Sequence, residues 1–383
     1  MASAPRIISK SVLPNSTPPK PWFHHLNIDT ILKVLYRTAF NPFLAWILVL
    51  CLRAQVTPPT HPAWIFSVSY AIIISLLFIL GTISHRVAYG LPRNVEPERE
   101  VVLVTGGASG LGLLIAQIYG KRGVAVAVLD VKDIVEEEVE EVFGEGVDLR
   151  YFKCDVGDRK ELEIAKKDIC KELGTPTIVI NCAAARINGK PLLELSPDDF
   201  EKTLRTNLTA AFHLYQAFLP GILGNAENGG TLVTVSSVLG QLGPAGLTDY
   251  SASKAGLSAL HRTMEAELRG NENIKTLLVE TGQMSTPLFN WIRNPSHFFS
   301  PVLEPVEVAK EIVATVDSGH GGVLRLPAFA KLINWYAVFP GALQVVARYL
   351  SGIDAVVSSS LQSREIPSNR AGRVLRSSKK RTD

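Results

Sequence analysis

Tyr250 and Lys254, in the stretch Tyr-Ser-Ala-Ser-Lys, have the residue types and spacing of an acid–base site. Residues four apart on a helix share one face, so this spacing places a phenol beside an ammonium group. A nearby positive charge favours the phenolate, so we expect the pKa of Tyr250 to fall toward neutral pH. Such a tyrosine exchanges protons with an alcohol or a ketone. An ordinary amphipathic helix can carry the same pair, so the assignment depends on the residues that accompany it.

A glycine-rich turn from Thr105 to Gly112 lies about 140 residues upstream of this pair. The apolar run 101–104 predicts a buried strand before the turn, and 111–121 a helix after it. Glycines permit a tight turn and let backbone amides approach a pyrophosphate at a helix N-terminus. The spacing of Gly106, Gly110 and Gly112 differs from the common G-x-G-x-x-G form, so the flanking strand and helix carry this assignment. Together with the Tyr–Lys pair, the turn predicts hydride transfer with a dinucleotide.

Asp130 ends the second predicted strand, eighteen residues after Gly112. A carboxylate at this position accepts hydrogen bonds from the adenosine ribose, and it repels a 2′-phosphate. Asp130 therefore favours NAD(H) over NADP(H). Lys132 lies close in the sequence and keeps NADP(H) possible, and a turn or cap aspartate is the alternative interpretation.

Short apolar strands alternate with helical stretches over most of the chain. The predicted strands are 101–104, 125–129, 150–153, 177–180, 231–235, 275–279 and 322–326. Polar residues follow several of them, at the edge where open parallel sheets bind ligands. The pattern predicts an α/β fold with a Rossmann-like doubly wound parallel sheet.

The first hundred residues contain two apolar runs that indicate a membrane anchor. The run 63–83 is long enough to cross a hydrocarbon core, which takes about 20 residues. The run 38–52 gives only about 22 Å of helix, so it either completes a two-helix hairpin, which we favour, or is re-entrant or interfacial. The basic residues that flank the pair on the outside are Lys33, Arg37, Arg86 and Arg93, whereas Arg53 lies between the two runs. Because basic residues are enriched on the cytosolic side of membrane spans, these positions suit a hairpin whose two ends both face the cytosol.

Composition and charge argue against nucleic-acid binding, a metal site and a cleaved signal peptide. The formal net charge of +3 provides no case for nucleic-acid binding. The four cysteines have no metal-ligand spacing and the eight histidines are scattered, so we expect no metal site. The first forty residues lack an early apolar core, which argues against a cleaved signal peptide.

With these motifs in order, the chain resembles membrane-anchored members of the short-chain dehydrogenase/reductase superfamily. It is most similar to the retinol and hydroxysteroid dehydrogenase branch, which includes fungal relatives. The resemblance covers roughly residues 100–330. Thr105 to Gly112 matches the family's T-G-x-x-x-G-x-G turn, and Tyr250 with Lys254 matches Y-x-x-x-K.

The resemblance implies four catalytic residues: Asn207, Ser237, Tyr250 and Lys254. Ser237 precedes Tyr250 by thirteen residues, the family interval for the serine that orients the substrate oxygen. Ser236 competes with it, but side chains alternate along a strand, so we favour Ser237. Asn207 matches the helix asparagine that connects the lysine to water in a proton relay.

The resemblance also implies a set of cofactor contacts. Asp155 is expected to bind the adenine amino group, Lys254 the nicotinamide ribose and Thr286 the carboxamide. Asn181 stands in N-C-A-A where the family has N-N-A-G, and Thr281 replaces the proline before Gly282. The full set is Thr105, Gly106, Ser109, Gly110, Leu111, Gly112, Asp130, Asp155, Asn181, Tyr250, Lys254, Gly282 and Thr286.

The chain therefore divides into a series of segments. They are a polar or interfacial segment 1–37, a membrane anchor 38–90, a catalytic domain 91–330, an apolar membrane-proximal segment 331–362 and a basic tail 363–383. The family often forms dimers, so a homodimer is possible here. The anchor indicates the endoplasmic reticulum membrane or lipid droplets, with the catalytic domain facing the cytosol.

The segments 287–292 and 297–299 are aromatic and aliphatic, which suits a lid over a flat or long apolar substrate. A retinoid, a steroid or another lipid alcohol would fit this description. The alternatives are an NADPH-dependent lipid ketone reductase and, from another class, a non-catalytic membrane scaffold that keeps the fold.

Overall fold

The computed structural model describes residues 26–135, 138–144, 146–225, 229–292, 294, 296, 298 and 300–357. The expectations for residues 1–25 and for the basic tail 363–383 lie outside these residues, as do His297 and Phe299 of the predicted lid.

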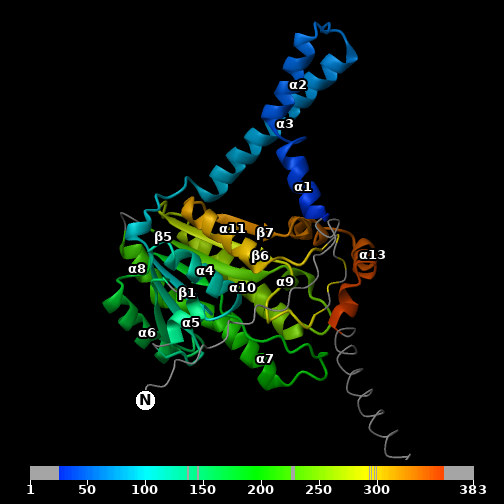
Figure 1. Cartoon of the computed structure of the whole chain (residues 1–383). Helices are drawn as coiled ribbons and strands as arrows, with labels where there is room; N and C mark the ends of the chain where they lie inside the picture. Colours follow the sequence, from blue (N-terminus) through cyan, green and yellow to red (C-terminus); the bar gives the residue numbers. More distant parts are fainter. Residues whose placement is uncertain are drawn as a thin grey trace, which may run out of the picture.

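Seven parallel strands form one sheet in the order β3-β2-β1-β4-β5-β6-β7 (Figure 1). The strands are β1 Val101–Thr105, β2 Ala125–Asp130, β3 Arg150–Lys153, β4 Ile178–Asn181, β5 Gly230–Ser237, β6 Ile274–Thr281 and β7 Gly322–Leu326. The strand order reverses between β1 and β4, and open parallel sheets bind ligands at the carboxyl ends of the strands at such a switch point. The predicted α/β fold with a Rossmann-like doubly wound parallel sheet is confirmed.

Helices cover both faces of the sheet because alternate strand residues point in opposite directions. Val102 and Val104 pack in the apolar cluster with α4 and α11, whereas Leu103 lies in the cluster with α6, α8 and α10. These helices are α4 Gly110–Gly120, α6 Arg159–Glu172, α8 Ala210–Gly224, α10 Thr248–Leu268 and α11 Pro305–Asp317. Shorter helices are η2 Pro97–Arg99, α5 Val139–Phe143, α7 Pro197–Leu204, the π-helix η4 Arg205–Thr209 and α9 Leu239–Leu242.

Three helices precede the sheet and project away from it (Figure 1). They are α1 Ile28–Arg37, α2 Pro42–Ala54 and α3 Pro62–Tyr89. Helices α2 and α3 pack together as a hairpin around Ala45, Val49 and Ala71, and Trp46 Nε1 donates to Ser75 Oγ across 3.0 Å. Pro42 begins α2 and Asn41 caps it, which explains why this helix is shorter than the apolar run. Within the described residues, α3 is long and apolar enough to cross a membrane, and α1 with α2 would qualify only as a pair bent by 54°.

The linker after α3 is fastened to the amino-terminal edge of the sheet. Arg93 NH1 lies 2.7 Å from Glu100 Oε1, and its Nε donates to Thr231 Oγ1 of β5. The other Glu100 oxygen accepts from Thr177 Oγ1. Both charged side chains are almost fully buried, so the chain just before the sheet is held by a paired, hydrogen-bonded charge cluster.

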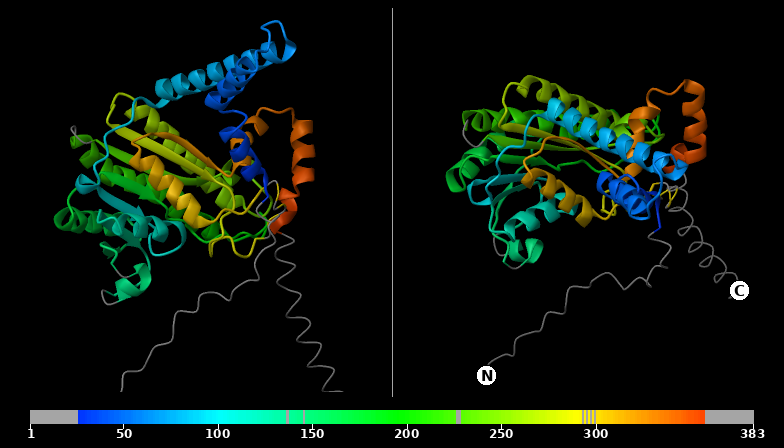
Figure 2. Two further views of the ribbon diagram at one scale, coloured as in Figure 1. Left: turned by 45° about the horizontal axis from the view of Figure 1, so that its top comes forward. Right: turned by 90° about the horizontal axis from the view of Figure 1, so that it is seen from above.

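The C-terminal helices lie at the opposite, carboxyl edge of the sheet, on the same side as α1 (Figure 2). They are η5 Ala328–Leu332, α12 Ile333–Tyr336, α13 Gly341–Ser351 and η6 Ile353–Ala355. Helix α1 contacts this region through Asp29 Oδ1, which accepts from the backbone amide of Ala328 at 2.6 Å. The segment that leads into the hairpin therefore touches the edge of the sheet at which a ligand would bind.

Candidate active site

The turn between β1 and α4 has no side chains where its backbone is most crowded. Gly106 and Gly110 adopt φ angles of +63° and +56°, which strain any residue with a Cβ atom. A Cβ atom at Gly112 would lie 2.4 Å from the carbonyl oxygen of Gly106. Ser109 is the N-cap residue of α4, and Leu111 is buried in its first turn. Because α4 starts just after β1, the backbone amides at its start border the switch point. This is a cradle into which a pyrophosphate fits.

Thr105 and Asn181 join the two strands on either side of the switch point. Thr105 Oγ1 donates to Asn181 Oδ1 at 2.8 Å and accepts from the amide of Ala183 at 3.2 Å. Both side chains are buried. Asn181 therefore braces the ends of β1 and β4, and the neighbouring Cys182 lies where the family has a second asparagine.

Asp130 and Lys132 lie together beside the glycine turn. Asp130 Oδ2 accepts from the amide of Ala108 at 2.9 Å, and its Oδ1 accepts from the amide of Lys132 at 3.2 Å. Lys132 Nζ donates to the carbonyl oxygen of Ala108 at 2.7 Å. A carboxylate and an ammonium thus lie at the end of β2, where the adenosine ribose is expected.

Asp155 is paired with a residue that the sequence analysis did not single out. Its Oδ2 lies 2.8 Å from Arg205 NH2, and its Oδ1 accepts from the amide of Gly157. Arg205 starts the π-helix that carries Asn207. Because the two residues are fifty positions apart, no local pattern indicates this ion pair.

Tyr250, Ser237 and Lys254 come together at the carboxyl edge of the sheet. All three side chains are buried. Ser237, at the end of β5, hydrogen-bonds Tyr250, which lies in the first turn of α10. Lys254 Nζ lies 5.8 Å from the centroid of the Tyr250 ring and donates to the carbonyl oxygen of Val235 at 2.9 Å. A phenol, a hydroxyl and an ammonium therefore share one buried site.

Ser236 points away from this group. Its Oγ donates to the carbonyl oxygen of Lys254 at 3.0 Å and lies 2.8 Å from Ser258 Oγ. Ser237 Oγ instead donates to Thr281 and accepts from the amide of Leu239. The alternation of side chains along β5 therefore separates a serine that packs under α10 from one that adjoins Tyr250.

The expected fall in the pKa of Tyr250 is wrong for this structure. Burial raises the pKa of Tyr250 to about 12, and the hydrogen bond with Ser237 opposes that rise only in part. Burial also lowers the pKa of Lys254 to about 8. The sequence argument considered only the charge of Lys254, whereas removal of the phenol from water has the larger effect.

Asn207 is fully buried within the π-helix η4. Its Oδ1 accepts from the amide of Ala185 at 2.7 Å, and its Nδ2 donates to Ser253 Oγ at 2.9 Å. Ser253 in turn donates to the carbonyl oxygen of Tyr250. Asn207 thus reaches the tyrosine helix through Ser253 and does not hydrogen-bond Lys254 itself. π-Helical turns frequently occur at functional sites.

The segment after β6 returns to the glycine turn. A Cβ atom at Gly110 would lie 3.8 Å from Cγ2 of Thr286, so these two residues face each other. Gly282 follows β6, and its amide donates to the carbonyl oxygen of Leu326. The segment after β6 thus brings Thr286, the residue expected to bind the carboxamide, close to the glycine turn.

An apolar cluster closes over the phenol of Tyr250. Phe289 and Ile292 from the predicted lid pack there with Ile187 and Leu247. Val357, near the end of the described chain, belongs to the same cluster and is 3% exposed. Phe298 of the second lid segment is instead partly exposed and accepts a backbone hydrogen bond from Ile28.

Besides Arg205, two further residues at the site escaped the sequence analysis. Asp249 is buried, and its carboxylate accepts from the amide of Tyr250, from Asn188 Nδ2 and from Thr203 Oγ1. Its position next to Tyr250 in the sequence could have indicated Asp249. Its hydrogen-bond partners lie on other elements and could not be read from the sequence. Nothing local indicated Val357, which lies 107 positions after Tyr250.

Within the described ranges, no group of three or more His, Cys, Asp or Glu side chains is arranged to hold a metal ion. The donors that surround the glycine turn are instead backbone amides, hydroxyl groups and single charges. That donor set fits a dinucleotide, whose phosphates and ribose hydroxyls are bound by such groups.

Comparisons with known proteins match this geometry. A family model described as short chain dehydrogenase matches residues 100–296, which include the glycine turn and Tyr250. An uncharacterised oxidoreductase of Saccharomyces cerevisiae is 29% identical over 70% of this chain and 86% of that protein. Epidermal retinol dehydrogenase 2 of Mus musculus is 30% identical over 63% of this chain and 78% of that protein. The 17-beta-hydroxysteroid dehydrogenase 13 of Rattus norvegicus is 32% identical over 63% of this chain and 82% of that protein.

Proposed function

Since the chain belongs to the short-chain dehydrogenase family of NAD(P)-dependent oxidoreductases, we propose that it interconverts a lipophilic alcohol and the corresponding carbonyl compound. The observation that carries this proposal is the joint burial of Ser237, Tyr250 and Lys254 at the carboxyl edge of the sheet, the edge from which the glycine turn also extends. A phenol that exchanges a proton, next to a cradle for a dinucleotide, suits hydride transfer to or from a carbon that bears oxygen.

The nicotinamide ring, when bound, supplies or accepts the hydride. Tyr250 exchanges the proton of the substrate oxygen: it donates in reduction and accepts in oxidation. Ser237 Oγ holds that oxygen and stabilises the charge that develops on it. Lys254 provides a positive charge near the phenolate, and Asn207 with Ser253 holds the tyrosine helix against the neighbouring loop. Burial keeps Tyr250 a neutral phenol, the form that reduction requires.

NAD(H) is the cofactor that we propose. Asp130 lies at the end of β2 with its carboxylate held by two backbone amides, which suits two ribose hydroxyl donors and opposes a 2′-phosphate. The rival is NADP(H), and Lys132 is the residue that favours it. Its ammonium group lies beside the same turn, where it would offset part of the charge of a phosphate.

The substrate side of Tyr250 is lined with aromatic and aliphatic groups, so we propose a retinoid, a steroid or a long-chain lipid. The retinol dehydrogenase and the hydroxysteroid dehydrogenase among the relatives support this class. A lipid ketone reductase that uses NADPH is the enzymatic alternative, and a scaffold without activity is the alternative from another class.

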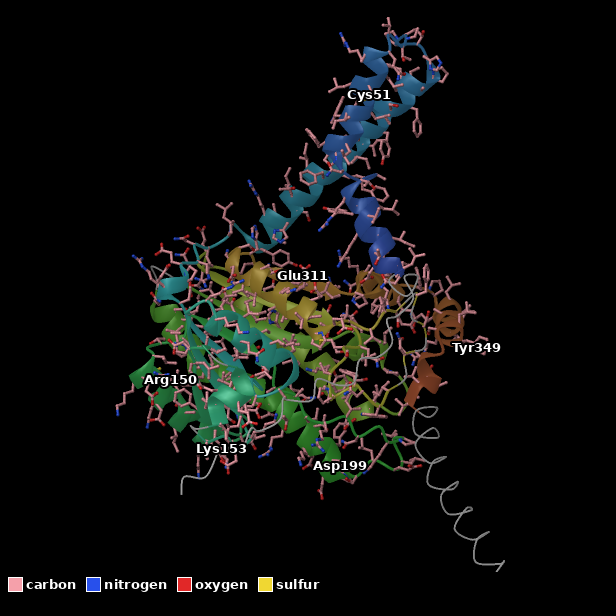
Figure 3. The ribbon with its side chains drawn as sticks, in the orientation of Figure 1. Cys51, Arg150, Lys153, Asp199, Glu311 and Tyr349 are labelled. Carbon is pink, nitrogen blue, oxygen red and sulfur yellow. The ribbon has the colours of Figure 1, made fainter. Side chains whose placement is uncertain are left out.

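We propose further that the hairpin anchors the protein in the endoplasmic reticulum membrane or on lipid droplets, with the catalytic domain in the cytosol. The length and apolar character of α3 and its packing with α2 support this. Figure 3 shows Cys51 on the hairpin, far from the sheet, and Tyr349 on the outer side of α13. Tyr349 and the neighbouring Leu350 and Val346 are exposed, so α13 offers a second surface for lipid.

Turnover of the full-length protein in detergent tests the proposal. The panel contains all-trans-retinol, oestradiol and 1-dodecanol with NAD⁺, their carbonyl counterparts with NADH, and the same pairs with the phosphorylated cofactors. We expect turnover of one apolar class with NAD(H). A clear preference for NADP(H) would overturn the role of Asp130. Cofactor binding without turnover of any apolar substrate would favour the scaffold.

A further inference from the structure

A charged pair ties the C-terminal helix to the turn that leads into the catalytic tyrosine. Arg348 on α13 donates to the carbonyl oxygens of Leu242 and Gly243 at 2.6 and 3.0 Å. Its Nε also donates to Asp354 Oδ2 at 2.9 Å. Asp354 Oδ1 accepts from the amide of Ala245 at 3.3 Å, so the pair holds both sides of this turn. We call Arg348 and Asp354 the C-terminal clamp.

The turn that the clamp holds is a helix end followed by a helix start. Gly243 caps α9 in the left-handed region with φ of +52°, and its carbonyl is among the groups that no helical amide satisfies. The guanidinium satisfies two such carbonyl oxygens and opposes the negative end of the helix dipole. Tyr250 follows only four residues after Gly246. The turn therefore leads directly into α10, the helix that carries Tyr250.

The clamp also lies close in the chain to Val357, whose side chain packs on the substrate side of the phenol. Val357 lies three residues after Asp354 and packs in the apolar cluster that contains Tyr250 and Phe289. A Cβ atom at Gly246 would lie 2.9 Å from Val357 Cγ1, so the turn and the C-terminal segment are in direct contact.

We infer that Arg348 and Asp354 are positioning residues for the substrate site, because they hold Val357 as part of the wall that apolar substrates contact. The C-terminal segment then helps to determine which substrates are accepted, although it lies outside the matched family region 100–296. This inference rests on the proposed function, and it adds residues far from the motifs to the site. Proton transfer at Tyr250 does not require the clamp, so its loss acts on substrate binding.

Kinetics of Arg348→Met and Val357→Ala in the full-length protein test the inference. Loss of the Val357 methyl groups removes apolar contact, so KM for the turned-over member of the all-trans-retinol, oestradiol and 1-dodecanol panel rises about tenfold. Turnover at saturation and the binding of NADH stay unchanged. The matched control is Lys310→Met, which breaks an exposed ion pair with Glu307 on α11 and leaves KM unchanged.

A double variant separates positioning from a general loss of stability. Arg348→Met acts through Val357, so adding Val357→Ala to it causes little further rise in KM. Fully additive effects would overturn the inference, as would an equal loss of kcat with every substrate.

Hydrogen exchange gives a readout that does not depend on turnover. We expect the backbone amides of Ala245 and Leu247 to exchange faster in Arg348→Met than in the wild-type protein and in Lys310→Met. Unchanged exchange would overturn the clamp even if the enzyme is active. Faster exchange in a protein that turns over no substrate would support the clamp while refuting the proposed function.

Discussion

Phe289 packs edge-on against Tyr250, with the ring centroids 6.0 Å apart and the ring planes at 90°. Both rings are almost fully buried, with Phe289 and Tyr250 each 3% exposed. We therefore expect a substrate that reaches the Tyr250 hydroxyl to contact the ring of Phe289 or to displace it.

Phe289→Leu tests the contribution of the ring to substrate choice. We expect KM for a flat ring substrate such as oestradiol to rise about two- to tenfold, since aromatic pairs add roughly 0.5–1.5 kcal/mol beyond burial. KM for 1-dodecanol should change little. Steady-state kinetics with both substrates measure this, and Phe212→Leu on the exposed side of α8 is the control. An equal change for both substrates would refute a role in selectivity.

Tyr250→Phe removes the proposed proton donor and keeps the ring. We expect kcat to fall by a factor of about 10² to 10⁴, the usual contribution of a positioned acid or base. NADH binding, followed by fluorescence, should be unchanged because the glycine turn is intact. Tyr349→Phe, on the exposed surface of α13, is the matched control. Unchanged turnover in Tyr250→Phe would show that another group transfers the proton.

Asp130→Asn tests the cofactor preference. The amide oxygen can still accept from a backbone amide, but the charge that repels a 2′-phosphate is gone. We expect KM for NAD⁺ to rise and the preference for NAD⁺ over NADP⁺ to shrink by about tenfold or more, as one lost charge interaction of 1–2 kcal/mol implies. Asp133→Asn, in an exposed ion pair with Lys153, controls for net charge. If the preference for NAD⁺ over NADP⁺ stays constant in Asp130→Asn, Asp130 does not bind the adenosine ribose.

Lys132→Met complements this test. Should NADP(H) be used at all, loss of the ammonium beside Ala108 should weaken NADP⁺ binding more than NAD⁺ binding.

The burial of His261 predicts that the folded protein loses stability in mild acid. Burial lowers the pKa of His261 to about 4, while the unfolded chain takes up the proton near the ordinary value of 6.5. Between these values the unfolded state binds more protons, so the free energy of unfolding rises with pH. The contribution of neutral His261 to the free energy of unfolding is complete above pH 6.5 and is lost as the pH falls toward 4. Melting temperatures of wild type and His261→Gln at pH 7 and pH 5 measure it.

The difference between the two proteins should shrink as the pH falls. His320→Gln, at a partly exposed position beside Ser318, is the control variant. A constant difference across this range would show that His261 does not titrate with folding.

Deletion of residues 1–91 tests the membrane anchor. The truncation removes α1, α2 and α3 but keeps Arg93 and its buried pair with Glu100, so the start of the sheet stays satisfied. We expect the truncated protein in the soluble fraction after carbonate extraction and the full-length protein in the pellet. Continued pelleting would assign membrane binding to α12 and α13, and Trp335→Ser with Leu350→Ser on that exposed surface would then release it.

The glycine turn and the doubly wound sheet could be predicted because they are encoded locally. A buried strand is visible in the sequence as an apolar run. Gly106 and Gly112 stand at positions where a Cβ atom would meet the backbone. The preference for Ser237 over Ser236 also follows from a local rule, the alternation of side chains along a strand. The structure agrees with that rule, since Ser236 bonds to Ser258 under α10.

Other features depended on how distant segments pack. The Asp155–Arg205 ion pair and the contact of Val357 with the Tyr250 cluster join residues separated by many positions, and no short-range period marks them. The pKa of Tyr250 is a balance between burial and charge, and the sequence shows the charge of Lys254 but not the burial. By itself, the sequence determined which groups can do chemistry, because residue type and local spacing set that. Only the tertiary structure decided what surrounds them, because desolvation and long-range contacts arise when the chain folds onto itself.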